Sequence, residues 1–234
     1  MKASTILLTS LVAMPFLACH SSVHQQLLSS KDDGAVKVVD ERPKDAILSV
    51  LNADGRSAIL ESRGYCVGPT AISYAFKITA LRRETRDTAQ KLRDILGANS
   101  NMHVEQDSDH VIKIFSDDVS HDLLSVHIHR VDLSSEEQYN QNDALLAALD
   151  APEVHDFISQ HKVTLATQLN GLRSIPGSEL PHMPAHIDDL TVEEYEARIL
   201  QTFPGLIVYQ ECFLPDGRRL VSFEADGIRE RQQR

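Results

Sequence analysis

The chain has 234 residues, of which 42% are hydrophobic and 24% are charged. The hydrophobic content is sufficient for one packed domain, and this composition argues against extended disorder. Its formal net charge of −11 gives a surface that repels phosphate backbones, so nucleic acid is not expected as a partner. The chain has no tryptophan and only 5% aromatic residues, so it offers few platforms for stacking bases or sugars.

The first residues are arranged as in a secretory signal peptide. Lys2 precedes an apolar stretch from Ile6 to Ala18, and small or polar residues follow as far as Ser22. The apolar stretch is too short to span a bilayer as a helix. We therefore expect a signal peptide at 1–21, a flexible leader at 22–35, one globular domain at 36–226 and a polar tail at 227–234.

A second interpretation of the N-terminus concerns Cys19. The stretch Phe16-Leu17-Ala18-Cys19 resembles the cleavage box of bacterial lipoproteins. Such boxes usually carry Leu three residues before the cysteine and a small residue two before it, where this chain has Phe16 and Leu17. The resemblance implies lipid anchoring through Cys19 as an alternative to release. Either outcome leaves Cys66 and Cys212, and this even number in an oxidising compartment favours one disulfide.

In the first half of the chain, turn and capping signals divide the apolar periodicity into elements. Pro43 and Gly55 bracket a predicted helix, and a short strand is predicted at 57–61. After Gly68-Pro69, apolar residues spaced near 3.6 predict a helical region that ends at Gly97, with or without a break at 82–87. Residues 98–109 are predicted to form a loop.

The second half predicts hairpins and capped helices. The expected elements are strands at 110–115 and 124–129 joined by a hairpin loop at 116–122, helices after Ser134 and Pro152, a strand at 163–169, a loop at 171–189, a helix capped by Thr191 and Glu194, and strands at 206–214 and 218–225. This order favours an α+β fold, with a mostly antiparallel sheet packed against several helices.

Cys66 has a catalytic interpretation beside the structural one. A thiol just before a helix has a lowered pKa, and papain-like enzymes place their nucleophile there. The run from Cys66 to Ala71 resembles the Cys-Gly-Pro-Thr-Ala motif of bacteriocin-processing cysteine peptidases, with Val67 inserted after the cysteine. His127 or His129, on one strand face, would be the base, and Asp132 would orient it.

Metal and cofactor signals are weak. The spacing of His127 and His129 suits metal ligands on a strand, so the two are weak candidates. His182 and His186 are separated by Pro184, which argues against a helical metalloprotease motif. Possible oxygen donors near these two are Asp188, Asp189 and Glu193. The chain has no P-loop, no Gly-x-Ser-x-Gly motif and no dinucleotide fingerprint, so no cofactor is expected.

Two functions follow from these signals. The favoured one is a secreted, non-enzymatic interaction protein of the virulence or effector type, which meets a protein partner outside the cell and has no membrane span. The alternative is a secreted papain-like thiol hydrolase that uses Cys66 with His127 or His129 and Asp132.

Overall fold

The computed structural model of the chain describes residues 42–80, 87–106, 111–166 and 181–228. The chain divides into two units, Met1–Asp32 and Asp33–Arg234, and all of the described residues belong to the second. The expected signal peptide and leader lie outside the described residues, as do residues 229–234 of the expected tail. Among the described helices, none is both long enough and apolar enough to cross a membrane.

Five α-helices lie in the described part of the chain: α1 (Pro43–Asp54), α2 (Thr88–Leu96), α3 (Gln141–Leu149), α4 (Pro152–His161) and α5 (Val192–Thr202). Their ends follow the local signals. In α1 the first residue is proline, and Gly55 takes the left-handed conformation with φ of 64° and donates its N–H to the Leu51 carbonyl. Thr191 and Glu194 form both halves of the capping box predicted for α5.

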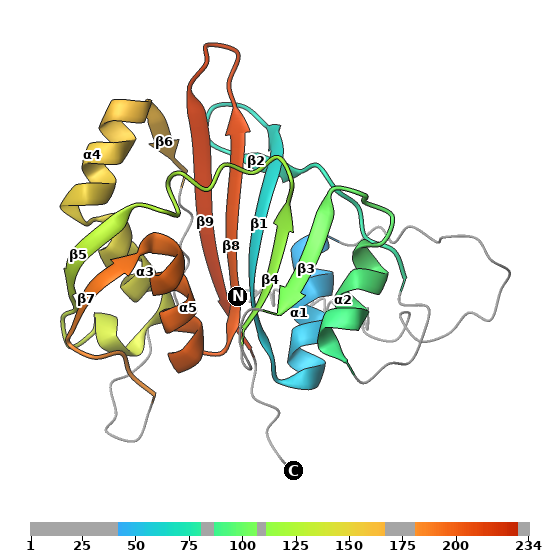
Figure 1. Cartoon of the computed structure of the whole chain (residues 1–234), viewed down its shortest axis with the longest axis horizontal. Coiled ribbons are helices and arrows are strands. Elements are labelled where there is room, and N and C mark those ends of the chain that lie inside the picture. The colour runs from blue at the N-terminus through green and yellow to red at the C-terminus, as the bar shows by residue number, and fades with distance from the viewer. Residues whose placement is uncertain (1–41, 81–86, 107–110, 167–180, 229–234) are drawn as a thin grey trace, which may run out of the picture. The chain divides into compact units, whose positions relative to one another are not determined.

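The strands form two sheets. They are β1 (Ser57–Cys66), β2 (Ile72–Tyr74), β3 (Met102–Gln106), β4 (Val111–Ser116), β5 (His127–Asp132), β6 (Val163–Leu165), β7 (His186–Thr191), β8 (Gly205–Phe213) and β9 (Arg219–Gly227). The main sheet has the order β3-β4-β1-β8-β9-β6, with β2 paired to the end of β1, and β5 pairs with β7 in a separate two-stranded sheet (Figure 1).

Helices cover both faces of the main sheet. On one face, α1 and α2 pack against Leu60 and Val208, and on the other, α3, α4 and α5 pack against Ile59 and Tyr209 (Figure 1). Successive side chains of a strand point to opposite faces, so β1 and β8 supply both cores. This explains the uninterrupted apolar runs Ala58–Leu60 in β1 and Leu206–Tyr209 in β8, where a strand with one face in water would alternate apolar and polar residues.

The α+β class is confirmed, but the expectation of a mostly antiparallel sheet is wrong because the sheet is mixed. β1 lies between β4 and β8 and is parallel to both, and β6 is parallel to β9. The pairs β3–β4, β8–β9 and β1–β2 are antiparallel. Parallel neighbours need long crossover connections, and the segments that carry α2 and α3 to α5 provide them. All three antiparallel pairs join strands that are close in sequence, and the β8–β9 hairpin is the one that the Pro-Asp-Gly turn signal predicted.

The helix predicted to start at Gly68-Pro69 is wrong. β1 continues to Cys66, the chain turns at Gly68 with φ of 72°, and β2 returns antiparallel to the end of β1. Gly64 permits this return, since a Cβ there would overlap the Ser73 carbonyl oxygen. Cys66 therefore lies at the end of a strand and not just before a helix, as the catalytic interpretation requires.

The expected hairpin between 110–115 and 124–129 is also wrong. β4 lies in the main sheet, whereas β5 pairs with β7, a strand inside the segment expected to be a loop. The segment predicted as a loop at 98–109 contains β3, an edge strand of mostly exposed residues. β3 and β7 carry few buried apolar side chains, so the apolar pattern of the sequence did not reveal them.

Candidate functional site

The predicted disulfide is present and joins the ends of two central strands. Cys66 is the last residue of β1 and Cys212 is near the end of β8, with Cα atoms 5.4 Å apart and a sequence separation of 146. In the chain-entropy model, a cross-link closing so long a loop stabilises the folded state by about 5 kcal/mol. It fixes the neighbouring backbones of β1 and β8 at this end of the sheet.

Large apolar side chains are exposed around this bridge. Tyr65, Val67 and Phe213 are 67%, 59% and 51% exposed, and each is next in sequence to a bridged cysteine. We call these three residues the tip. The fourth large hydrophobic residue exposed in the described part of the chain is Leu146, at 37%, on α3. Single exposed apolar residues are ordinary, but three gathered at one place form a patch of the kind that contacts partners.

Beneath the tip, Phe213 is supported by a buried ion pair. The Arg63 guanidinium lies 4.8 Å from the centre of the Phe213 ring, and its Nη2 lies 3.1 Å from Oε1 of Glu211. The parallel register places Arg63 directly beside Glu211. The backbone N–H of Arg63 also donates to Ser116 Oγ at the end of β4. The aromatic side chain is therefore held on a rigid base rather than on a flexible loop.

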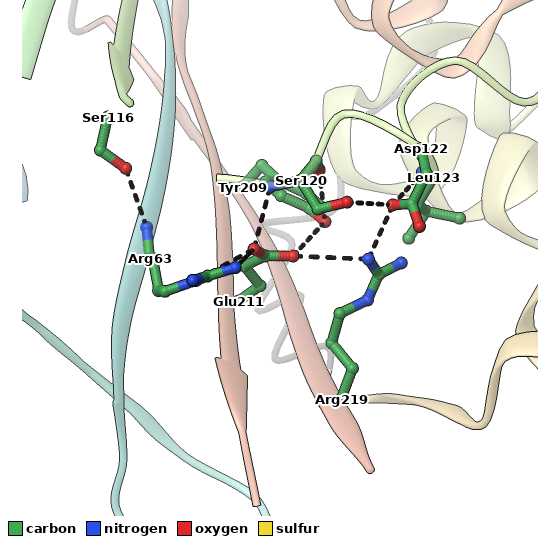
Figure 2. A network of polar contacts seen from close by, with 8 residues as sticks. All are labelled: Arg63, Ser116, Ser120, Asp122, Leu123, Tyr209, Glu211 and Arg219. Atoms are coloured by element: carbon green, nitrogen blue, oxygen red, sulfur yellow. Dashed lines mark hydrogen bonds and ion pairs between the residues drawn. The ribbon is translucent and has the colours of Figure 1, made fainter. Parts of the chain in front are cut away.

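Glu211 is the centre of the network in Figure 2. Its carboxylate is fully buried and accepts hydrogen bonds from the backbone N–H of Ser120 at 2.9 Å and from the Tyr209 hydroxyl at 3.3 Å. Arg219 Nη1 lies 3.6 Å from its second oxygen. A buried carboxylate is stable only when its charge is paired and its lone pairs are satisfied, and these contacts meet both conditions.

Asp122 extends the network toward the surface. It accepts hydrogen bonds from Arg219 Nη1 and from the hydroxyl of Ser120, both at 2.7 Å, and from the N–H of Leu123. Burial opposes ionisation of Asp122, but the hydrogen bonds from Ser120 and Arg219 hold its pKa below the ordinary value. Arg219 is thus shared between two carboxylates that belong to β8 and to the segment after β4.

A second polar cluster lies on the same face of β1, two residues before Arg63. The fully buried Glu61 lies 3.1 Å from Lys113 Nζ on β4 and 3.1 Å from Nδ1 of His121. Both contacts are ion pairs whose directions fall outside hydrogen-bond geometry. Lys113 also pairs with Glu193 on α5. Burial raises the pKa of Glu61, and the charge of Lys113 offsets only part of this effect.

Glu196 completes this second cluster from α5. It is fully buried, and neither of its carboxyl oxygens has a hydrogen-bond partner among the described residues. Burial raises the pKa of Glu196 well above its ordinary value, and the negative charges of Glu61 and Glu193 raise it further. The neutral acid is therefore the form that this position stabilises.

The second cluster carries its own countercharge. One ligand atom each from Glu61, His121 and Glu193 lies within 4.8 Å of the others, a grouping that could hold a metal ion. The Lys113 ammonium, however, contacts both of these glutamates and supplies the positive charge that an ion would bring. We therefore regard this cluster as an internal ion-pair network.

The proposed catalytic residues lie in different sheets. Cys66 is at the end of β1 in the main sheet and is bridged, so it offers no thiolate in this state. His127 and His129 are exposed on β5, on the face expected from the alternation. Asp132 pairs with Arg130 at 2.8 Å, and the carboxylate nearest the two imidazoles is that of Asp189.

Three buried glutamates were not singled out from the sequence. Glu211 stands inside the apolar run of β8, and Glu196 stands on the apolar stripe of α5 between Tyr195 and Ile199. Both acids stand at positions where the repeat of apolar residues in the helix or strand predicts an apolar side chain, and this mismatch is the signal that could have identified them. Glu61 ends a short apolar run and has no comparable signal.

Comparison of the chain with protein-family models, with curated proteins and with solved structures found no match.

Substituting Glu211 with Gln should strongly destabilise the fold. Gln keeps the size of the side chain but removes the charge that Arg63 and Arg219 share, so two partly buried guanidinium groups lose a partner. We expect the free energy of unfolding in urea to fall by about 3 kcal/mol. Asp216→Asn removes a carboxylate from the exposed pair with Arg218 and should change stability little. Equal effects of the two substitutions would show that the buried network is not special.

Glu196→Gln should stabilise the protein at neutral pH. The folded state favours the neutral acid, whereas the unfolded chain ionises near the ordinary pKa of 4.5. Stability from this group is therefore fully present below that pH and is lost as the pH rises toward the raised pKa. Urea unfolding at pH 4, 5.5 and 7 should show an advantage of the Gln variant that grows with pH. A difference that is constant across the three pH values would contradict the assignment.

Proposed function

We propose that the protein is exported from the cytoplasm and acts outside the cell as a non-enzymatic binding protein, contacting a protein partner through the tip. The observation that carries this proposal is the gathering of Tyr65, Val67 and Phe213 around the Cys66–Cys212 bridge. An effector that acts on a host or neighbouring cell is the specific form of this function that we favour.

Export is supported by the disulfide together with the N-terminal sequence. Disulfides persist in oxidising compartments, and the first 21 residues have the composition of a signal peptide. Release and lipid anchoring through Cys19 both deliver the folded unit to the same side of the membrane. The measured mass of the mature protein distinguishes them.

Binding through the tip is supported by the way in which its side chains are held. Aromatic residues and arginine are enriched at the centres of protein interfaces, and Phe213 stacks on Arg63 here. The bridge and the Arg63–Glu211 ion pair order this surface before any partner arrives. Little conformational entropy is then lost on association, which favours affinity.

The alternative hydrolase requires a free Cys66. With the bridge formed, Cys66 cannot be a nucleophile, and His127 and His129 stand on a strand of the other sheet. No contact in the described part of the chain joins Cys66 to either histidine, so the geometry supports binding better than catalysis.

Export is tested by mass and thiol analysis of the protein made in its own host. We expect the mature chain outside the cytoplasm without residues 1–21, or cleaved before a lipid-modified Cys19. Alkylation without a reductant should leave Cys66 and Cys212 unlabelled, and alkylation after reduction should label both. A cytoplasmic, full-length chain with labelled thiols would refute the proposal of export.

Partner binding is tested at the tip with a photo-crosslinking residue. Placed at Phe213 it should yield a discrete crosslinked product when the protein meets its target cells, whereas the same residue at Leu146 should not. Tyr65→Ser with Phe213→Ser should abolish binding to those cells, because the apolar area that drives association is lost.

Leu146→Ser is the matched control, since it removes an exposed apolar residue far along the chain from the bridge. All variants should keep the thermal unfolding midpoint of the parent within a few degrees, because each residue is exposed. Undiminished binding by the Tyr65/Phe213 double variant would show that the tip is not the contact surface.

A further inference from the structure

Two histidines and an aspartate meet on the outer face of the two-stranded sheet. His127 and His129 are separated by one residue on β5, so their side chains project from the same face. Asp189 lies across from them on β7. Its Oδ1 is 3.9 Å from His127 Nε2 and 3.8 Å from His129 Nδ1, and the two imidazole rings are 5.4 Å apart.

The backbone is distorted at Asp189, the residue whose carboxylate meets the two imidazoles. Asp189 has φ of 57°, in the left-handed region, although it stands inside a strand. The ladder pairs Ile128 with Leu190 and Arg130 with Asp188, but the pair between them, His129 with Asp189, is missing. Aspartate tolerates the left-handed region better than most residues, but the conformation remains unfavourable in a strand. The distortion therefore accompanies a carboxylate that is presented to two imidazoles.

We propose that His127, His129 and Asp189 bind a divalent transition-metal ion of the zinc class. Two imidazole nitrogens and one carboxylate oxygen are a donor set that such ions prefer. Ligand atoms around a tetrahedral ion with bonds of about 2.0–2.2 Å lie about 3.3–3.6 Å apart. The ligand atoms of this cluster all lie within 4.8 Å of one another, and all three side chains are exposed.

The surroundings of this cluster favour a cation. Lys113 contacts both glutamates of the Glu61 cluster, but no lysine or arginine in the described part of the chain pairs with the carboxylate of Asp189. The neighbouring Arg130 is engaged by Asp132. Further negative charge is close, because the carboxylate of Glu153 accepts the His129 backbone N–H.

Three protein ligands leave at least one coordination position open. Water can fill it, or a side chain of a second protein can. The site stands on a different sheet from the tip, and its occupation does not depend on the proposed partner. A metal could therefore be bound whether or not the tip is the contact surface.

Calorimetric titration of the purified, tag-free protein with Zn²⁺, its disulfide intact, tests the proposal. We expect saturable binding of one equivalent at this site, and Co²⁺ should give the visible absorption of a low-symmetry site. His127→Ala, His129→Ala and Asp189→Asn should each weaken Zn²⁺ binding on the order of tenfold or more, because each histidine variant loses a nitrogen ligand and Asp189→Asn loses the negative charge of its oxygen ligand. Asparagine also tolerates the left-handed region, so Asp189→Asn removes the charge without changing the backbone preference.

His155→Ala is the matched control. His155 is another exposed histidine with a nearby carboxylate, 3.7 Å from Asp150, and it should have no effect on the titration. Thermal unfolding of each variant checks that the fold is intact, and the exposure of all four side chains makes a folding failure unexpected. No saturable Zn²⁺ binding, or binding that all three ligand variants retain at full strength, would overturn the proposal.

Discussion

The Glu211 carboxylate is the constraint on which the end of the main sheet depends. It is fully buried between β1 and β9, and two arginines, a tyrosine hydroxyl and a backbone N–H converge on it. An ionised carboxylate at such a position is tolerated only because these groups replace its hydration. The two arginines come from the strands on either side, so the charge also fixes how β1, β8 and β9 lie beside one another. Phe213, stacked on Arg63, is positioned through the same charge.

Two buried glutamates also hold the segment that follows β4. The N–H of Ser120 donates to Glu211, and the next residue, His121, pairs with Glu61. Adjacent residues of one segment thus contact acids on β1 and β8, two strands that are far apart in sequence but are neighbours in the sheet. Val119, Leu123 and Leu124 in this segment are buried in the core beside α3 to α5. Polar contacts fix where the segment crosses the strand ends, and apolar burial holds its remainder.

Local signals predicted several helix ends and one hairpin, whereas tertiary pairing decided which strands are neighbours in the sheet. Proline and glycine at the ends of α1, the capping box of α5 and the turn between β8 and β9 act within a few residues, so the sequence alone revealed them. The parallel pairing of β1 with β8 joins segments about 150 positions apart and leaves no local trace. The return of β2 onto β1 depends on the small size of Gly64, which a helical periodicity search cannot detect.

The candidate site was predictable only where its signals are local in sequence. Counting cysteines gave the Cys66–Cys212 bridge, and alternation gave the exposed face of His127 and His129. The contact of Asp189 with these histidines follows only from the pairing of β7 with β5, because the sequence predicts a loop in the segment around Asp189. The buried glutamates were hidden because burial of a charge depends on partners from other strands.

Three features of this protein break local rules, and each breaks a different one. The tip exposes aromatic and aliphatic side chains to water, Asp189 holds a left-handed conformation in a strand, and Glu196 is buried without a hydrogen-bond partner. Natural sequences keep such violations mainly at functional or strained positions. Glu196 can be tolerated by remaining protonated, which removes the charge but leaves its polar atoms unpaired. At the tip, a partner surface would cover the apolar side chains, and at Asp189 a cation would neutralise the carboxylate that the distorted strand presents. Both of these would come from outside the folded unit, whereas protonation of Glu196 needs no partner.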